Sequence, residues 1–231
     1  MALKDAVDWH QENAKYFDSN YVHDKAFIER FAVWTKVMDQ YSDENNHVLD
    51  IGCGSGILSC YLAERNKSVI GIDGSAAMLK ICESRKQDAK LENVNFLTKN
   101  ISDLGDVISE KADLIICSSV LEYLDDLDES LELITSFLKD NGVFILSMPN
   151  RQSLYRKLEP VMFKLTGRPK YYKFVQNVGT VKEIDAKLNV YGLKVLDSSF
   201  YAKTKVLSSV MHALGRPQNS DNLFIVVARK S

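Results

Sequence analysis

Short apolar runs alternate with helical patterns from residue 47 to the end of the chain. Between the runs, apolar residues recur at helical spacing, as in 57–65 and 75–90. Runs of this length are typical of buried strands, and their alternation with helices predicts a mostly parallel sheet with helices on both faces. The expected strands are HVLDI (47–51), SVIGID (68–73), NVNFLT (93–98), ADLIIC (112–117), GVFILSMP (142–149), LKVLDSSF (193–200) and NLFIVVAR (222–229).

Two of the expected helices carry clear end signals. The segment 125–141 has acidic residues in its first turn, Lys139 in its last turn and Gly142 just beyond, which favours a helix over this whole range. Thr180 and Glu183 have the spacing of a capping box, which predicts that another helix begins at Thr180. The apolar face of the first of these helices would consist of Leu127, Leu131, Ile134 and Leu138.

Length and composition indicate one globular domain. The chain has 231 residues, of which 45% are hydrophobic and 26% charged. Residues before the first strand look helical, with Phe27, Phe31, Trp34, Met38 and Tyr41 at helical spacing. We therefore expect a single domain over 1–231, made of an N-terminal helical cap (1–41), a ligand-binding core (42–149), a basic aromatic lid insert (150–179) and a C-terminal part of the sheet (180–231).

Charge and cysteine content restrict the partners and the compartment. The net charge of −2 does not favour DNA as a partner. The first twenty residues have no apolar stretch like that of a signal peptide, and the runs 114–121 and 143–148 are too short to span a bilayer. The four cysteines form no C-x-x-C pair. We expect a cytoplasmic protein with reduced core thiols and no metal site.

A glycine-rich turn, Gly52-Cys53-Gly54-Ser55-Gly56, joins the first strand to a helix. Such turns let the backbone approach a ligand closely and present N–H groups to it. A dinucleotide site would need a third glycine where Ile57 stands. Asp50, at the end of the strand, would repel a diphosphate but could accept hydrogen bonds from an ammonium group. The turn therefore predicts a nucleoside-like but cationic cofactor.

Asp73 lies at the end of the second strand, 21 residues after Gly52. An acidic residue in this position can accept hydrogen bonds from both ribose hydroxyls of a nucleoside. The glycine turn and Asp73 together make a stronger signal than either feature alone.

The motifs VLDIGCGSG (48–56) and VIGIDGSAAML (69–79) resemble those of class I S-adenosylmethionine-dependent methyltransferases. FLTKNISDL (96–104), DLIICSSVLEYL (113–124) and GVFILSMPNR (142–151) follow in the family's order. The resemblance covers about 40–150 closely and the remainder in layout. It implies a Rossmann-like, doubly wound, seven-stranded sheet with an antiparallel last strand. It also implies S-adenosylmethionine as cofactor and a small-molecule acceptor.

The resemblance assigns cofactor contacts to particular residues. Asp50 and Gly52 would hold the methionine end, and Asp73 would take the ribose hydroxyls. Asn100 would read the adenine edge together with Ile101, although the family more often has Asp at the position of Asn100. The further contacts implied are those of Tyr16 and Tyr21 over the methionine, Cys53, Gly54 and Gly56 in the turn, Gly74 and Met78 beside the adenine, and Cys117 and Ser118 near the sulfonium.

Methyl transfer from a sulfonium is an in-line displacement, so the protein mainly aligns the reactants and excludes water. A hydroxyl acceptor would be helped by a general base. Glu122 and Tyr123 follow the fourth strand at its carboxyl end, where ligands bind in such sheets. His23 lies in the expected cap and is the third candidate, whereas His10, His47 and His212 are weaker ones.

The insert carries seven basic residues over 151–175, opposed by Glu159 alone, with aromatic residues interleaved. Such a lid suits an anionic or amphiphilic acceptor, or a peripheral membrane contact through 150–177. The alternative is a charged helix whose apolar face packs on the domain. Pro160 is expected to break the helix. The apolar stripe would consist of Leu154, Leu158, Val161, Met162 and Leu165.

Several functions compete with methylation of an ordinary small molecule. Layout and the segment SMPNR also resemble quinone-biosynthetic O-methyltransferases, which would act on a lipid-like acceptor near a membrane. An RNA methyltransferase is a further alternative, although Cys117-Ser-Ser-Val120 replaces the Asn/Asp-Pro-Pro-Tyr-like tetrapeptide of base-flipping enzymes. The last alternative is a regulatory protein that binds the cofactor without catalysing a reaction. The sequence leaves both monomer and homodimer open.

Overall fold

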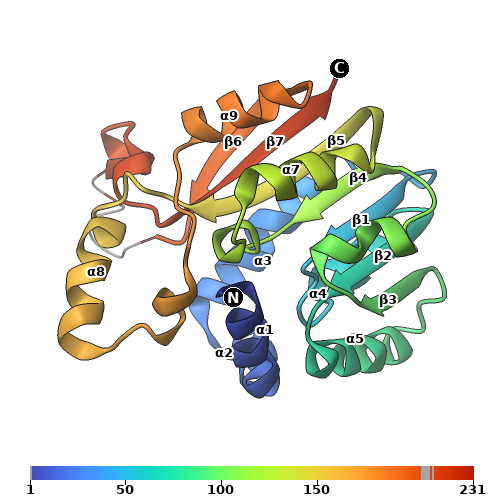
Figure 1. Ribbon diagram of the computed structural model, residues 1–231, viewed down its shortest axis with the longest axis horizontal. Coiled ribbons are helices and arrows are strands. Elements are labelled where there is room, and N and C mark those ends of the chain that lie inside the picture. The colour runs from blue at the N-terminus through green and yellow to red at the C-terminus, as the bar shows by residue number, and fades with distance from the viewer. Residues whose placement is uncertain (1, 204–208, 210) are drawn as a thin grey trace.

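The computed structural model describes residues 2–203, 209 and 211–231, which contain a seven-stranded sheet of order β3-β2-β1-β4-β5-β7-β6 (Figure 1). The pairs among β1 to β5 are parallel, and β7 runs antiparallel to both β5 and β6. The expected fold class is therefore confirmed. The strands are β1 (His47–Ile51), β2 (Ser68–Asp73), β3 (Val94–Thr98), β4 (Ala112–Cys117), β5 (Leu138–Pro149), β6 (Leu193–Tyr201) and β7 (Leu223–Lys230).

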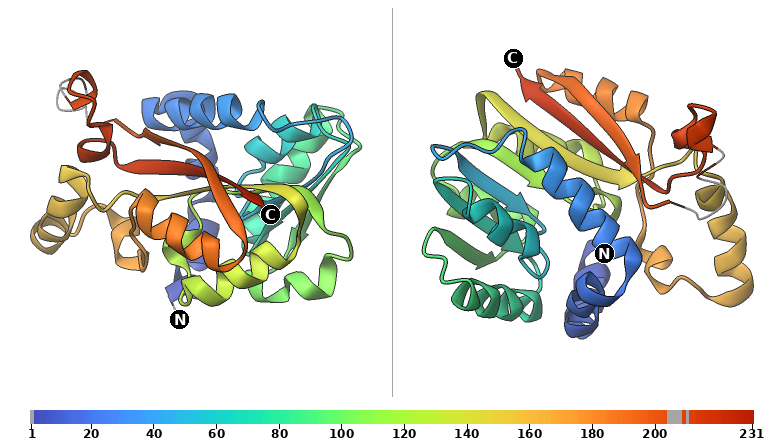
Figure 2. Two further views of the ribbon diagram at one scale, coloured as in Figure 1. Left: turned by 90° about the horizontal axis from the view of Figure 1, so that it is seen from above. Right: turned by 180° about the vertical axis from the view of Figure 1, so that it is seen from behind.

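Helices cover both faces of the sheet (Figure 2). The α-helices are α1 (Ala2–Glu12), α2 (Ala14–His23), α3 (Lys25–Met38), α4 (Ile57–Ala63), α5 (Ala76–Asp88), α6 (Leu104–Val107), α7 (Leu127–Ser136), α8 (Leu154–Thr166) and α9 (Val181–Val190). Short 3-10 helices are η1 (Ile101–Asp103), η2 (Leu121–Tyr123), η3 (Lys170–Phe174) and η4 (Pro217–Asn219).

Each face of the sheet has its own apolar core. On one face, Trp34 and Met38 of α3 pack with Leu58 and Leu62 of α4. On the other face, side chains of α6, α7 and α9 pack together, including Leu131 of α7. Because α3 is part of a core, only α1 and α2 of the expected N-terminal cap lie beyond the sheet. No helix among the described residues is long and apolar enough to cross a membrane.

The chain leaves β1 toward β2 on one side, and β4 lies on the other side of β1. The order of the strands thus reverses at β1, and ligands of open α/β sheets bind at such a point, outside the carboxyl ends of the strands. The glycine turn, Asp73 and the residues after β4 all meet there.

The helix expected over 125–141 is shorter in the structure. Its N-terminus agrees, since the Asp126 side chain accepts a hydrogen bond from the backbone N–H of Glu129, but α7 ends at Ser136. Leu138 pairs with Ala112 and already belongs to β5. Leu138 is buried in a strand as well as it would be in a helix, so its spacing alone could not separate the two.

The insert also differs from expectation. Helix α8 continues through Pro160, although this residue has no N–H group to donate to the preceding turn of the helix. The apolar stripe forms one helix face, but that face does not pack on the domain. Its members range from 40% exposed for Met162 to 79% exposed for Leu165.

Candidate active site

A cavity lies at the carboxyl ends of β1, β2 and β4, covered by α1, α2 and α3. Most residues that the sequence assigns to the cofactor line it: Tyr21, Asp50, Gly52, Cys53, Gly54, Asp73, Gly74, Met78, Asn100, Ile101 and Ser118. The structure therefore brings together residues from five separate stretches of the chain.

The glycine turn has a backbone that other residues would not accept. Gly52 has a φ of 69°, and a Cβ added to it would lie 2.1 Å from Cγ2 of Val120. Gly56 has a φ of 73°, and its added Cβ would lie 2.8 Å from Sγ of Cys82. Both the left-handed conformation and the close packing require glycine. The turn thereby leaves room for a ligand beside the carboxyl end of β1.

Asp73 holds this turn in place. Its Oδ2 accepts a hydrogen bond of 2.9 Å from the backbone N–H of Gly54, and its Oδ1 accepts one of 2.8 Å from that of Ser75. Burial raises the pKa of Asp73, and these two hydrogen bonds oppose that effect. Each carboxylate oxygen has further lone pairs, so Asp73 can still accept hydrogen bonds from two ligand hydroxyls.

Asp50 provides a buried carboxyl group at the other side of the turn. It is 1% exposed, and its Oδ2 accepts a hydrogen bond of 2.5 Å from the Ser59 hydroxyl. Burial raises the pKa of Asp50 to about 7, although the Ser59 hydrogen bond and the charge of Arg30 lower it. A ligand ammonium group next to Asp50 would favour the charged carboxylate.

Arg30, from α3, reaches into the same cavity. One of its terminal nitrogens donates to the carbonyl of Ser118 at 2.9 Å and to its hydroxyl at 2.7 Å. Its Nε is buried and has no hydrogen-bond partner. A guanidinium with a free N–H group is suited to bind a carboxylate. Asp50 and Arg30 together can therefore hold the ammonium and carboxylate groups of an amino acid.

Aromatic rings form the wall that α1 and α2 contribute. The ring of His10 lies 5.5 Å from that of Phe17 and 5.7 Å from that of Tyr123, and all three line the cavity. Burial, together with the charge of Arg30, lowers the pKa of His10 to about 4. His10 is therefore a neutral imidazole at pH 7, and this wall can exclude water from a reacting centre.

Asn100 lies where we expect the heterocyclic base of a nucleoside to bind. It is the N-cap of η1, and its backbone N–H and its side-chain amide donate to Oδ2 of Asp103 at 3.4 and 3.5 Å. Its neighbours in the cavity include Gly74, Met78 and Ile101. Apolar contact from Met78 and Ile101 with a polar edge from Asn100 suits a flat heterocycle such as adenine.

Glu122 is buried on η2 and does not itself line the cavity, whereas its neighbour Tyr123 does. Glu122 is 4% exposed, and its Oε2 has no hydrogen-bond partner. Burial raises its pKa to about 7, opposed by hydrogen bonding and by the charges of Arg30 and Arg156. Its backbone carbonyl accepts hydrogen bonds from the N–H groups of Gln176 and Asn177, at 2.7 and 3.1 Å. The insert thus fastens directly onto the residue that carries this carboxyl group.

Tyr123, the neighbour of Glu122, lines the cavity. Burial raises the pKa of its hydroxyl, and the nearby Glu122 carboxyl raises it further. Tyr123 is therefore protonated at neutral pH and can donate a hydrogen bond to a ligand.

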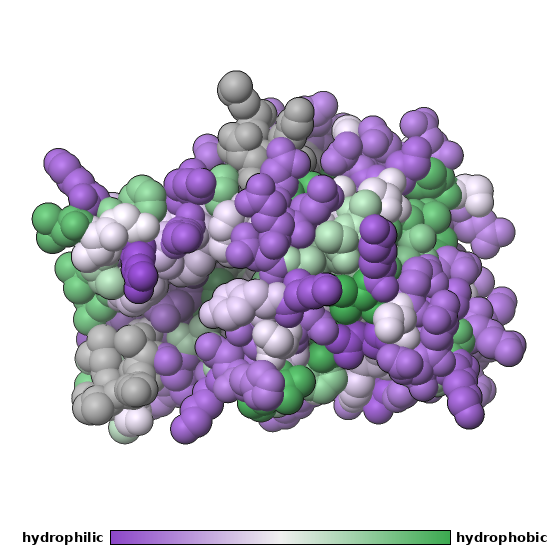
Figure 3. All heavy atoms as spheres, turned by 90° about the horizontal axis from the view of Figure 1, so that it is seen from below, coloured by the Kyte–Doolittle hydropathy of each residue, from purple (hydrophilic) through white to green (hydrophobic). Residues whose placement is uncertain are grey.

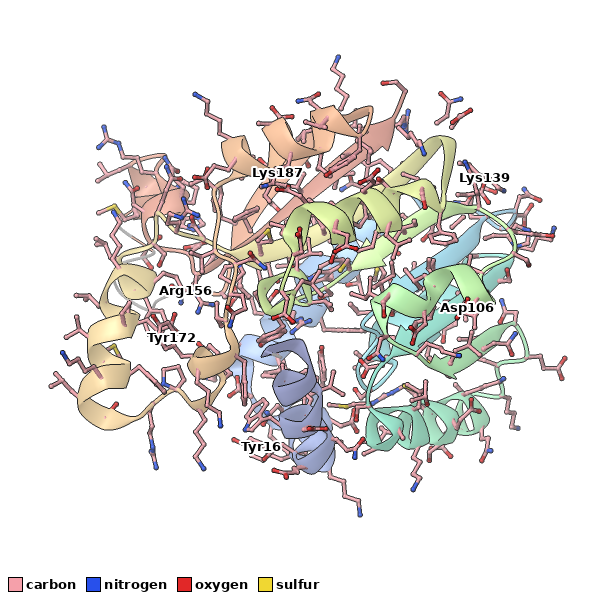
Figure 4. The ribbon with its side chains drawn as sticks, viewed as in Figure 1. Tyr16, Asp106, Lys139, Arg156, Tyr172 and Lys187 are labelled. Carbon is pink, nitrogen blue, oxygen red and sulfur yellow. The ribbon has the colours of Figure 1, made fainter. Side chains whose placement is uncertain are left out.

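Other predicted residues lie outside the cavity lining. His23 is exposed at the end of α2, and Tyr16 is 71% exposed on the outside of that helix (Figure 4). Gly56 packs against Cys82 and Phe96, and Cys117 is buried in the core at the end of β4. Of the residues described, no group of His, Cys, Asp and Glu side chains is arranged to hold a metal ion.

Comparisons with known proteins agree with this arrangement. A family described as a methyltransferase domain matches residues 42–198. The ubiquinone biosynthesis O-methyltransferase of Coxiella burnetii is 29% identical over 115 residues, which are 50% of this chain and 48% of that protein. The chain thus matches about half the length of this curated relative.

Solved structures share the fold. A SAM-dependent methyltransferase from Archaeoglobus fulgidus superposes with a TM-score of 0.67 at 19% identity, over 93% of this chain and 98% of that one. The [4+2]-cyclase SpnF superposes with a TM-score of 0.63 at 16% identity, over 86% of this chain and 80% of that one. Identities this low show the fold alone, whereas the family match extends over most of the chain. This chain belongs to the methyltransferase-domain family.

Proposed function

We propose that this protein transfers a methyl group from S-adenosylmethionine to a small-molecule acceptor by in-line displacement. The observation that carries the proposal is the placement of Arg30, Asp50 and Asp73 around one cavity. The cofactor has a carboxylate, an ammonium group and a ribose, and Arg30, Asp50 and Asp73 are respectively complementary to these three groups.

The rest of the cavity fits the same ligand. Asn100 and Ile101 would read the adenine, with Met78 against its face. The sequence assigns cofactor contacts to Cys53 and Gly54 of the turn, and we propose that both residues make these contacts through their backbone. Tyr21 lines the cavity, whereas Tyr16 is exposed, so we assign the cofactor contact to Tyr21.

Bound S-adenosylmethionine would supply a methyl group that its sulfonium already activates. The residues of the chain then have to align the acceptor, exclude water and remove a proton. Methyl transfer to a hydroxyl or amine forms the new bond to carbon, breaks the bond to sulfur and releases one proton. We assign that proton to the Glu122 carboxylate, with the Tyr123 hydroxyl donating a hydrogen bond that orients the acceptor.

The acceptor itself is proposed to be anionic or amphiphilic, because the insert that hydrogen-bonds to the backbone of Glu122 is basic and aromatic. A lipid-like amphiphilic acceptor would reside in a membrane, so the proposal includes a peripheral membrane contact of the segment 150–177. We place the reaction in the cytoplasm, and it requires neither DNA nor a metal ion.

Titration calorimetry tests the cofactor assignment. S-adenosylmethionine and S-adenosylhomocysteine should bind with micromolar affinity, whereas NAD should not bind. Asp73→Ala should lose binding, and Arg151→Ala should retain it because Arg151 is an exposed residue paired with Glu183. Failure of both sulfur nucleotides to bind to folded wild-type protein would refute the assignment.

A turnover assay tests catalysis separately. Incubation with S-adenosylmethionine and a panel of phenols, amines and carboxylates should produce S-adenosylhomocysteine with at least one acceptor. RNA should be included as a competing acceptor. Tight cofactor binding without turnover on any acceptor would instead support a cofactor-binding protein that does not catalyse methyl transfer.

A further inference from the structure

Helix α8 is held to the rest of the protein by Arg156, whose Nε donates to the backbone carbonyl of Asn222 at 3.3 Å. Nη1 of Arg156 lies 3.0 and 2.7 Å from the two carboxylate oxygens of Glu159, and the Tyr171 hydroxyl donates to Glu159 at 2.9 Å. The side chains of Arg156 and Glu159 are only 9% and 2% exposed. Arg156 points from α8 toward the centre of the molecule (Figure 4).

The opposite face of α8 is apolar and faces solvent. We call it the outer face of α8; it consists of Leu154, Leu158, Val161, Met162 and Leu165, which are 41%, 59%, 56%, 40% and 79% exposed. Amphipathic helices of globular proteins normally turn their apolar face to the core, so the orientation of α8 is reversed. Hydrophobic surface of this kind marks a site of interaction. In Figure 3 it lies at the left edge, the end of the molecule that carries α8.

The exposed charges around the outer face are all positive. Lys157 and Lys164 lie on α8 itself, and Arg168 and Lys170 follow it, each of them exposed. Glu159 is the only acidic residue over 150–175, and it is the one that is buried. Over the described residues 150–175 the surface therefore combines exposed apolar side chains with cations, and the one carboxylate in this range is buried.

We propose that the outer face of α8 docks onto an anionic lipid bilayer. Its apolar side chains would enter the boundary between headgroups and acyl chains, and the four cations would contact lipid phosphates. A second copy of this chain is a poorer occupant, because a symmetric contact across this face would bring the same cations together. The proposal deepens the proposed function, since it names the surface from which an amphiphilic acceptor would be taken.

Vesicle co-sedimentation tests the proposal. Wild-type protein should sediment with vesicles of phosphatidylcholine and phosphatidylglycerol, more weakly as salt is raised, and should remain in solution with phosphatidylcholine alone. The double variant Leu158→Ser/Leu165→Ser should bind at least about tenfold more weakly. Lys157→Gln and Lys164→Gln should each lower binding about fivefold.

The matched control is Val190→Ser, which removes an apolar side chain that is 77% exposed on α9. This variant should bind vesicles as the wild type does. Calorimetry with S-adenosylhomocysteine should give the same affinity for all variants, so a loss of lipid binding cannot be confused with misfolding or with failure of the cofactor assignment.

Three results would overturn the proposal. The first is wild-type protein that does not sediment with the anionic vesicles, and the second is a Leu158→Ser/Leu165→Ser variant that sediments as well as the wild type. The third is a lipid-free homodimer that this double variant converts to a monomer, which would show that the outer face of α8 binds a second copy instead.

Discussion

Arg30 is the residue at the cofactor end of the site that motif analysis overlooked. The glycine turn and Asp73 occupy fixed places after strands, whereas Arg30 lies on a helix that no motif describes. A signal was nevertheless present. Arg30 falls three residues after Phe27 and four before Trp34, on the apolar face of the helix. A charge in such a position requires a buried partner or a ligand.

The aromatic residues of the N-terminal helices also lie outside any motif. His10, Phe17, Tyr16 and His23 all lie on α1 or α2, and the sequence does not show which of them point inward. The structure turns His10 and Phe17 into the cavity and leaves Tyr16 and His23 exposed. The direction depends on how α1 and α2 dock, which is a property of the whole fold.

Arg30 should make the protein bind a cofactor that carries a carboxylate more tightly than one that lacks it. Wild-type protein is expected to bind S-adenosylmethionine roughly ten- to a hundredfold more tightly than its decarboxylated analogue, because a charge-assisted hydrogen bond contributes about 1.5–3 kcal/mol. Arg30→Met should weaken binding of S-adenosylmethionine and abolish the preference. Calorimetry with both ligands measures this. An Arg30→Met variant that keeps the preference would place the carboxylate elsewhere.

Glu122 should set the pH dependence of catalysis. A base must be deprotonated to act, so kcat/KM should rise with pH through about 7 and then level off. Glu122→Gln should lower the plateau at least about a hundredfold and remove the inflection. The measurement is a pH profile with the acceptor found by screening. An unchanged inflection in Glu122→Gln would assign the titration to another group.

The strands were predictable from the sequence, whereas the ends of some helices were not. Each expected strand overlaps an observed one, because short apolar runs bounded by glycine or polar residues have few other places in an α/β fold. The end of α7 was misplaced since Leu138 fits both a helix face and β5. The outward orientation of α8 could not be predicted, because a hydrophobic stripe in the sequence indicates an apolar helix face but not whether the protein core or another partner covers that face.

Gly52 of the glycine turn should tolerate no side chain. Gly52→Ala would force a Cβ into Val120 and strain a φ of 69°, so we expect a loss of stability of more than about 1 kcal/mol and a loss of cofactor binding. Gly105→Ala is the control, since nothing lies within 4 Å of its added Cβ and it sits in α6. Thermal denaturation and calorimetry check both variants. Equal behaviour of the two would contradict the packing argument.

The folded molecule buries the carboxyl groups of Asp50 and Glu122 at the candidate active site. Burial raises the pKa of Asp50 and of Glu122 to about 7, whereas both groups titrate near pH 4 in an unfolded chain. Between about pH 4 and 7 the native state therefore binds more protons than the unfolded state. The free energy of unfolding must fall as pH rises through this window.

We expect the melting temperature of the ligand-free protein to decrease from pH 5 to pH 7.5. The double variant Asp50→Asn/Glu122→Gln should show a smaller decrease. Asp113→Asn is the control: hydrogen bonds from Lys139 and His47 lower the pKa of Asp113 despite the opposing effect of burial, so its contribution is lost only at lower pH. A wild-type stability that rises over this range would show that the two carboxyl groups are charged in the native state.

The insert is closed at its base. The backbone N–H of Arg151 donates to the carbonyl of Gly179 at 2.8 Å, and that of Gly179 donates to the carbonyl of Pro149 at 3.0 Å. The two ends of the insert therefore lie side by side at the end of β5. Doubling the length of a flexible loop adds only about 0.6 kcal/mol of closure entropy. Segments of other lengths and chemistries could be exchanged here without altering β5 or α9, which makes this junction a natural place to graft a new acceptor specificity.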